Sequence, residues 1–386
     1  MYLPNYKDGS IVNLMSSILQ AQGGKSEYDS LPSLNPNELS KSQNIVLMII
    51  DGLGYEYLAK YGKDTIFTKY LKDKITSVFL PTTAVAITTF LTGVAPAQHG
   101  ITGWFVYLKE LGLVSTILFF NPRCGGLNFG KINVKPEMIF NEKTIFEKIN
   151  RKSYHITKKQ YVNSDYTTAF CKGAKRLSYK NLSGFFRKVK KALKSKDKKY
   201  ICAYWSKFDY LCHKYGTKSK EVAAHFEELN VRLTAFLKSI ENTDTTIIIT
   251  ADHGLIDSDR TKTIELKRHP KLMETLALPL SGDPRVAYCY VRPSRTKQFE
   301  NYIKQNFENI CYLYKSEDLI KKNFFGLYEP NPKLFDRVGD YTLIMKENYI
   351  IKDFILGEEE KFLIGHHGGI SKDEMFVPLI VVKTEH

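Results

Sequence analysis

NIVLMIIDG, the stretch at residues 44–52, begins with an almost unbroken apolar run and ends in a carboxylate followed by glycine. A strand that is buried on both faces of a parallel sheet requires such a run. Similar runs recur at 76–80, 114–120, 200–204, 245–249 and 375–382. Helical patterns separate them, as at 221–237. This alternation predicts an α/β fold with a central, mostly parallel sheet covered by helices on both faces.

Two stretches lie outside this alternation. Residues 1–44 contain a short amphipathic segment at 11–20 and then become polar, so we expect a lead-in that wraps the surface. Between 255 and 363 proline is more frequent, and a core-like strand follows the segment. We therefore interpret 255–363 as a smaller inserted cap subdomain. The catalytic α/β domain would then consist of 45–254 and 364–386.

The composition excludes several classes of protein. Hydrophobic residues make up 43% of the 386-residue chain and charged residues 25%, which rules out disordered and fibrous architectures. No apolar stretch approaches the ~20 residues that a membrane-spanning helix needs, and no secretory signal is apparent. The six cysteines lie far apart without a CxxC pair, which favours reduced thiols. We expect a soluble, cytoplasmic protein.

The chain is basic, with 56 Lys and Arg against 41 Asp and Glu and a formal charge of +15. Such a balance can attract nucleic acid, an anionic membrane or a small phosphorylated substrate. Part of the excess lies in one run, at 187–199, which is also typical of a solvated helix face. We expect a small phosphorylated substrate and keep nucleic-acid binding as a remote alternative.

Carboxylates and imidazoles follow several of the predicted strands, where open α/β sheets bind their ligands. Each occurrence alone has an ordinary explanation, such as a turn, a helix cap or a surface pair one helical turn apart. Together they offer enough oxygen and nitrogen ligands for two divalent ions, zinc first, with manganese or iron possible. The residues concerned are Asp51, Asp209, His213, Asp252, His253, His366 and His367.

A candidate nucleophile lies in LPTTAVAITTFLTG, residues 80–93. We expect a strand to end at Pro81 and a helix to run over 84–92, which makes Thr82 or Thr83 a helix N-cap. That position also directs a hydroxyl to a helix N-terminus, where free N–H groups favour a phosphate. Coordination to a dication would make such a hydroxyl a competent nucleophile.

The motifs taken together resemble the alkaline phosphatase superfamily, and most closely its type I phosphodiesterase/nucleotide pyrophosphatase branch. The resemblance extends from about residue 44 to 382. It implies a two-zinc centre that activates a threonine, which attacks a phosphodiester and forms a phospho-enzyme intermediate that water hydrolyses. The motifs that carry it are IIDG (49–52), PTTAVAITTFLTGVAPAQHG (81–100), DYLCHKYG (209–216), TADHG (250–254) and GHHGG (365–369).

The resemblance also assigns roles to individual residues. Thr83, directly before Ala84, matches the nucleophile and would also touch a metal, with Thr82 in reserve. His366 is the reserve for His367, which directly precedes a glycine as the family histidine does. The first zinc, which activates the nucleophile, would be held by Asp51, Asp252 and His253. The second zinc, which stabilises the phosphate, would be held by Asp209, His213 and His367.

The chain departs from the family at one substrate contact. Nucleotide pyrophosphatases place an asparagine shortly after the His-Gly pair, and here Trp104 occupies the corresponding position. Asn121 and Arg123 could supply the missing donors. Trp104 and Tyr107 could stack on a ring of the substrate or pack the floor of the pocket. We expect a metal-dependent phosphodiester or pyrophosphate hydrolase; the alternative is a phosphomonoesterase or another phosphoryl-transfer enzyme of the superfamily.

Overall fold

The computed structural model describes residues 1–126, 128–194 and 196–384. It contains a large sheet of seven strands with the order β2-β18-β9-β1-β8-β6-β7. Five of them, from β9 to β7, are parallel, whereas β18 is antiparallel to both β9 and β2. The strands are β1 (Asn44–Ile50), β2 (Leu71–Thr76), β6 (Lys152–Lys158), β7 (Ala174–Tyr179), β8 (Lys199–Trp205), β9 (Thr245–Thr250) and β18 (Phe376–Thr384).

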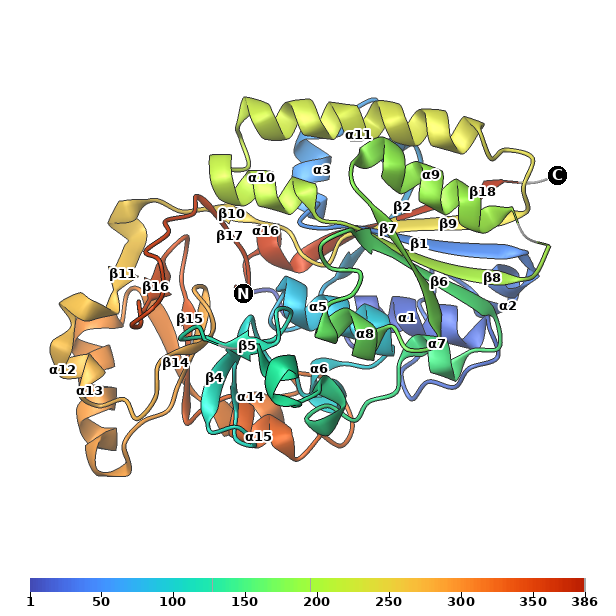
Figure 1. The fold of residues 1–386 in the computed structure, drawn as a ribbon. Coiled ribbons are helices and arrows are strands. Elements are labelled where there is room, and N and C mark those ends of the chain that lie inside the picture. Colours follow the sequence, from blue (N-terminus) through green and yellow to red (C-terminus); the bar gives the residue numbers. More distant parts are fainter. Residues whose placement is uncertain (127, 195, 385–386) are drawn as a thin grey trace.

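Helices cover both faces of this sheet (Figure 1). One layer contains α3 (Tyr55–Tyr61), α9 (Leu182–Leu193), α10 (Lys207–Tyr215) and α11 (Lys220–Lys238). The other contains α1 (Ile11–Gln20), α5 (Thr83–Thr92), α7 (Ile145–Lys148) and α8 (Asp165–Phe170). The predicted α/β class, with a mostly parallel central sheet between helices, is confirmed.

The N-terminal helix differs from the expectation for the lead-in. Residues 11–19 of α1 are all buried, and α1 packs against α5 beneath the central sheet. Its polar residues are buried except for Gln20, and Asn13, for example, donates hydrogen bonds to the backbone carbonyls of Tyr6, Lys7 and Asp29. The helix therefore belongs to the core rather than to a surface wrapping.

A second sheet lies beside the first, and its neighbouring strands are antiparallel, in the order β14-β15-β13-β12-β3-β4-β5. It combines segments from two distant parts of the sequence, so 104–122 shares a sheet with 281–345. The division of the chain into a catalytic domain and a 255–363 cap stays a prediction. The strands are β3 (Phe105–Leu108), β4 (Leu113–Thr116), β5 (Asn121–Pro122), β12 (Ser281–Asp283), β13 (Val286–Cys289), β14 (Cys311–Lys315) and β15 (Tyr341–Met345).

Two predicted strands are placed differently in the structure. The run at 114–120 supplies β4 to the second sheet instead of a core strand to the first. The run at 76–80 is not a strand, because β2 ends at Thr76 and residues 77–80 continue as buried chain without strand pairing. The apolar residues at 77–80 indicate that this segment is buried. A loop inside the core is buried in the same way as a strand, so apolarity alone does not distinguish the two.

The remaining elements are short. β10 (Ile256–Asp257) pairs antiparallel with β17 (Gly365–His366), and β11 (Thr263–Glu265) pairs parallel with β16 (Ile350–Lys352). Within the described ranges, no helix combines the length and apolarity that crossing a membrane needs. The other helices are α2 (Pro36–Lys41), α4 (Ile66–Lys69), α6 (Pro96–His99), α12 (Pro270–Met273), α13 (Thr296–Phe307), α14 (Ser316–Lys321), α15 (Lys333–Arg337) and α16 (Lys372–Met375).

The strand register brings several chain ends to one edge of the central sheet. Ile50 of β1 lies opposite Trp205 of β8, and Ile49 lies opposite Thr250 of β9. The three strands are parallel, so the residues that follow them emerge at the same carboxyl edge. This is where a ligand site of an open α/β sheet is expected.

Candidate active site

Asp51 lies directly after β1 and is buried. Its Oδ2 accepts a hydrogen bond from the hydroxyl of Tyr204 at the end of β8. Burial raises the pKa of Asp51 well above its usual range, and the nearby Asp252 and Asp209 carboxylates raise it further. Gly52 follows with a φ of +75°, and a Cβ there would come within 3.2 Å of the Asp209 Cα. Glycine thus permits the tight turn that brings Asp51 and Asp209 together.

Asp252 and His253 follow β9 and meet Asp51 from the neighbouring strand. Asp252 Oδ1 accepts hydrogen bonds from the N–H groups of Gly52 and His253, both at 3.1 Å. The His253 Nε2 lies 3.5 Å from Asp51 Oδ1 and 3.5 Å from Asp252 Oδ2. Its Nδ1 lies 3.1 Å from the carbonyl of Gly254, which assigns the ring proton to Nδ1 and leaves the Nε2 lone pair facing the carboxylates.

Asp209 and His213 lie one turn apart on α10, as their spacing predicts. His213 Nε2 lies 3.3 Å from Asp209 Oδ2, and His213 Nδ1 donates to the carbonyl of Gly365 at 2.7 Å. Burial opposes the charged form of both groups, but their mutual attraction lowers the pKa of Asp209 and raises the pKa of His213. Each group thus favours the charged form of the other.

His367 completes a second group of ligand-type side chains. Single ligand atoms of Asp209, His253 and His367 lie within 4.8 Å of one another, as do those of Asp51, Asp252 and His253. The His253 and His367 rings stack with their centroids 3.8 Å apart, and the His213 ring centroid lies 5.1 Å from that of His367. His253 therefore joins both groups, whereas the resemblance assigned it to the first alone. His213, which the resemblance assigned to the second, is in neither of these two groups. Neighbouring His366 donates instead to the carbonyl of Leu363, at 3.0 Å.

The polar atoms of these groups fit a metal centre. In the described part of the chain, some of their buried atoms find no hydrogen-bond partner; these are Asp51 Oδ1, Asp209 Oδ1, Asp252 Oδ2 and His367 Nδ1. A buried polar atom that stays unpaired is costly by about 1–3 kcal/mol, so such atoms are rare in native proteins. Carboxylate oxygens and imidazole nitrogens that converge in this way are the ligand set that zinc and similar divalent ions take.

Thr83 lies beside this centre as the first residue of α5. Its Oγ1 lies 3.1 Å from His253 Nε2. Thr82 is the N-cap residue, and its hydroxyl donates to Asp283 Oδ1 at 3.2 Å, facing away from the imidazole. The predicted helix is present and ends at Gly93, which has the left-handed φ of +77°. Of the two threonines, Thr83 is therefore the one whose hydroxyl contacts the candidate ligands.

Asp283 lies on β12 of the second sheet, and the sequence does not identify it as a site residue. It is buried, and its Oδ2 accepts a hydrogen bond from the N–H of Trp104 at 3.0 Å. Burial raises the pKa of Asp283 to about 7. The only local signal is SGDP at 281–284, which resembles an ordinary turn. Asp283 connects the second sheet to the residue that precedes Thr83.

A cavity of about 890 Å³ opens from this centre, bordered by Asp51, Thr83, Asp209, His213 and His367 among other residues. Trp104 lines it and packs edge-on against Phe119, with ring centroids 5.7 Å apart. Tyr107 packs instead against Tyr290, the residue after β13, with ring centroids 5.1 Å apart.

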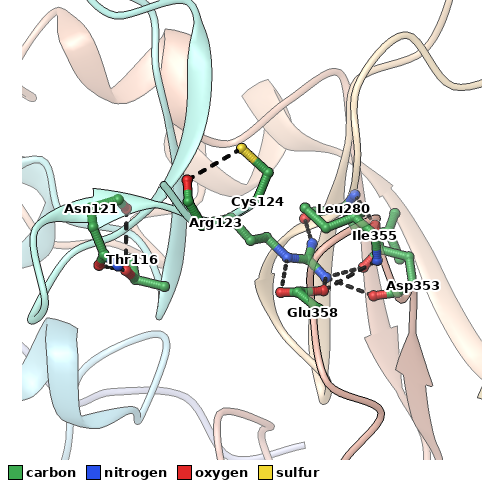
Figure 2. Close-up of polar contacts among 9 residues, drawn as sticks. Thr116, Asn121, Arg123, Cys124, Leu280, Asp353, Ile355 and Glu358 are labelled. Carbon is green, nitrogen blue, oxygen red and sulfur yellow. Dashed lines mark hydrogen bonds and ion pairs between the residues drawn. The ribbon is translucent and has the colours of Figure 1, made fainter. Parts of the chain in front are cut away.

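The two other predicted substrate contacts differ in placement (Figure 2). Arg123 borders the cavity, but its guanidinium donates to Glu358, Asp353 and the carbonyl of Leu280. Asn121 accepts a hydrogen bond from Thr116 at 2.5 Å, and it does not border the cavity within the described ranges. Substrate contact by either residue stays a prediction.

Comparison with known proteins identifies the family. A profile of the type I phosphodiesterase / nucleotide pyrophosphatase family matches residues 45–370. The chain belongs to this family. It is accordingly a hydrolase of the phosphodiesterase/nucleotide pyrophosphatase type, within the alkaline phosphatase superfamily. A comparison with curated proteins finds no match.

Solved structures of low sequence identity share the fold. An inactive threonine-to-alanine form of murine ectonucleotide pyrophosphatase / phosphodiesterase 5 in complex with AMP has a TM-score of 0.65 and 18% identity over 87% of both chains. Human ectonucleotide pyrophosphatase / phosphodiesterase 5 has a TM-score of 0.63 and 16% identity over 87% of both chains. Phosphonoacetate hydrolase from Sinorhizobium meliloti 1021 in complex with phosphonoformate has a TM-score of 0.64 and 18% identity, over 87% of this chain and 89% of that one.

Proposed function

We propose that this protein hydrolyses a phosphodiester or pyrophosphate bond with Thr83 as nucleophile, beside two zinc ions. The observation that carries the proposal is the position of the Thr83 hydroxyl, 3.1 Å from His253 Nε2. His253 belongs to both groups of candidate ligands, so the hydroxyl lies where the two groups meet. Membership of the type I phosphodiesterase family supports the reaction class.

The ligands divide between the two ions as follows. Asp51, Asp252 and His253 would hold the first ion, and Asp209, His213 and His367 the second. When bound, the ions would lower the pKa of the threonine hydroxyl and neutralise the charge of the phosphate oxygens. Tyr204 orients Asp51 through its hydroxyl, and the Gly52 and His253 N–H groups orient Asp252.

The chain's own groups then account for the covalent steps. Thr83 Oγ bonds to phosphorus while the bond to the leaving oxygen breaks, and the leaving group takes up a proton. The N-terminus of α5 favours the phosphate, because its first N–H groups are unpaired within the helix. Water then attacks the phosphothreonine, which releases phosphate monoester and returns the proton to Thr83.

The substrate is a small phosphorylated compound. The cavity is large enough to receive an organic group as well as the phosphate. Murine ectonucleotide pyrophosphatase / phosphodiesterase 5 shares the fold, and its structure was solved in complex with AMP. A nucleotide-like ester is therefore one candidate substrate for this chain too. We place Trp104 among the substrate-contacting residues, because it borders the cavity near Thr83, and keep Asn121 and Arg123 as weaker candidates.

Hydrolysis of bis(p-nitrophenyl) phosphate tests the proposal. The purified protein should release p-nitrophenolate, lose this activity after chelation with EDTA and dialysis, and recover it on addition of zinc. The rate with p-nitrophenyl phosphate, a monoester, should be much lower. A higher rate with the monoester would favour the phosphomonoesterase alternative, and activity that survives complete metal removal would contradict the metal-dependent mechanism.

A further inference from the structure

Arg123, which borders the cavity, forms a network of polar contacts with Glu358, Asp353 and Leu280 (Figure 2). Its Nε and Nη2 donate to the two carboxylate oxygens of Glu358, at 2.8 and 2.9 Å. Nη2 also donates to Asp353 Oδ1 at 2.7 Å, and Nη1 donates to the carbonyl of Leu280 at 2.7 Å. The face of the guanidinium lies 4.2 Å from the centroid of the Phe105 ring. We call Arg123, Asp353 and Glu358 the Arg123 cluster.

The cluster is largely shielded from water. The side chains of Arg123, Asp353 and Glu358 are 4%, 11% and 18% exposed. A bidentate guanidinium–carboxylate pair in such surroundings is strong and geometrically specific. Since every nitrogen of the guanidinium already donates to the protein, Arg123 is poorly suited to bind a phosphate of the substrate as well.

The cluster joins two segments that are distant in sequence. Arg123 follows β5 in the second sheet, whereas Asp353 and Glu358 belong to the stretch 353–363 between β16 and β17, here called the 353–363 loop. The backbones also approach closely, because a Cβ at Gly357 would lie 2.7 Å from the carbonyl oxygen of Cys124. The loop is thus held against the 121–124 segment by both charge and packing.

Both segments border the same cavity as the candidate active site. The stretch 104–123 contributes Trp104, Phe105, Leu118, Phe119 and Arg123, and the loop contributes Asp353, Phe354, Glu358, Glu359, Lys361 and Leu363. A chain of contacts leads from Thr83 to this wall, because Asp283 bonds to both Thr82 and the Trp104 N–H. The charged side chains of this wall pair with one another, as Arg123 does with Asp353 and Glu358, and Glu359 with Lys361. The other side chains of the wall are aromatic or aliphatic.

We propose that Arg123 is a positioning residue for substrate selection: through Asp353 and Glu358 it fixes the 353–363 loop as a cavity wall that receives the non-leaving ester group. The wall selects a diester whose non-leaving group is aromatic or otherwise apolar. This inference rests on the proposed phosphodiesterase function and adds the class of substrate. The network was not foreseeable from the sequence, since Arg123 and Glu358 are 235 positions apart.

Two reporters with the same leaving group test the selection. Bis(p-nitrophenyl) phosphate leaves an aromatic ester behind, and methyl p-nitrophenyl phosphate leaves only a methyl ester. In Glu358→Gln the KM for the bis-aryl ester should rise about tenfold, because an apolar contact to the substrate is loosened. The KM for the methyl ester and both kcat values should stay within about twofold of wild type. Arg123→Lys, which keeps the charge but loses the fork, should behave in the same way.

The matched control is Glu360→Gln. Glu360 lies on the same loop but is not among the described residues that border the cavity. Its side chain is 49% exposed and pairs with exposed Lys267, a weak contact, so it does not hold the loop to Arg123. This variant removes the same charge and should leave both KM values unchanged. Equal changes for the two reporters in Glu358→Gln, or equal changes in Glu358→Gln and Glu360→Gln, would overturn the proposal.

Limited trypsin digestion tests the position of the loop without enzymatic activity. Lys361 is 68% exposed, and cleavage after it should be several-fold faster in Glu358→Gln and in Arg123→Lys than in wild type. Identical cleavage rates in all three proteins would contradict the restraint by Arg123.

Calorimetric binding of the two esters to Thr83→Ala protein measures the same selectivity without turnover. Adding Glu358→Gln to the Thr83→Ala protein should weaken binding of the bis-aryl ester and leave binding of the methyl ester unchanged. If wild type hydrolyses neither reporter, the proposed function fails. The digestion and binding results then still decide whether Arg123 positions a selective wall.

Discussion

Two groups of charged residues border one cavity, and they differ in how their charges are satisfied. At the carboxyl edge of the central sheet, Asp51, Asp209 and Asp252 each keep a buried oxygen that finds no partner within the described ranges. In the Arg123 cluster, 353–358 supplies two carboxylates that are both bonded to one guanidinium. Unpaired buried oxygens suit a site that awaits cations, whereas a satisfied network suits a wall that must keep its shape.

A third group extends the comparison. The buried Arg285 donates to both carboxylate oxygens of Glu374, at 3.0 and 3.1 Å. Glu374 also accepts from the N–H of Gly369, two residues after His367. The Arg285–Glu374 pair thus holds the backbone shortly after His367, a candidate metal ligand. A charged pair with all its hydrogen bonds made fixes the position of a residue of the unpaired group.

The largest expected effect is on turnover. Thr83→Ala should lower kcat for bis(p-nitrophenyl) phosphate by about 10³-fold or more, because it removes the nucleophile. The matched variant Thr82→Ala, which loses the hydrogen bond to Asp283, should retain most of the activity. Steady-state rates at saturating substrate decide between them. If Thr83→Ala kept full turnover, another group would have to be the nucleophile.

Breaking the satisfied pair should destabilise the protein. Glu374→Gln leaves the Arg285 charge buried without its partner and should lower the free energy of unfolding by about 3 kcal/mol, measured in urea. The matched control is Glu56→Gln, whose 3.2 Å pair with Lys372 is partly exposed. It should change stability by less than about 1 kcal/mol. Equal effects of the two variants would show that burial of the pair does not matter.

Removing the unpaired charge of Asp51 should raise the stability of the metal-free protein instead of lowering it. The pKa of Asp51 is raised by burial and by repulsion from Asp252 and Asp209, so Asp51→Asn should stabilise the metal-free protein by about 1 kcal/mol. The same variant should gain less stability from added zinc than wild type does. Thermal unfolding with EDTA and with zinc measures both. If metal-free Asp51→Asn protein were less stable than metal-free wild type, the proposed difference between the unpaired and the paired charged groups would be contradicted.

A smaller effect concerns pH. The native pKa of Asp283 is raised to about 7, so between its ordinary range near pH 4 and pH 7 the folded protein holds a proton that the unfolded chain has released. The stability from this group is therefore present at low pH and falls as the pH rises through that window, with a slope of up to ~1.4 kcal/mol per pH unit. Asp283→Asn should flatten this part of the profile of unfolding free energy in metal-free protein. Parallel profiles for wild type and variant would refute the assignment.

The sequence locates side chains that the structure brings together at one edge of the central sheet, because their signal is local; metal binding by them stays a prediction. Asp51 and the pair Asp252–His253 each follow a continuous apolar strand, and parallel strands necessarily end at a common edge. From the residues alone, the candidate nucleophile could be narrowed only to Thr82 or Thr83. The start of a helix does not reveal which of the two hydroxyls faces the candidate metal ligands. The structure separates them through the Thr82 bond to Asp283.

The cavity wall could not be predicted in the same way. Asp283 reaches Thr82 across 201 positions, and Arg123 reaches Asp353 across 230 positions. Such contacts depend on how two sheets meet, which no periodicity in the chain encodes. For the same reason, the sequence predicts Arg123 as a phosphate donor, the ordinary role of a guanidinium near a phosphate site, and does not reveal its carboxylate partners.

Metal content measured by mass spectrometry tests the central claim most directly. Wild-type protein loaded with zinc and then desalted should carry two zinc ions per chain, and Thr83→Ala and Glu358→Gln should carry the same number. Asp252→Asn and His367→Ala should each carry fewer. Wild-type protein that retains no zinc after loading, or ligand variants that retain as much as wild type, would contradict the account.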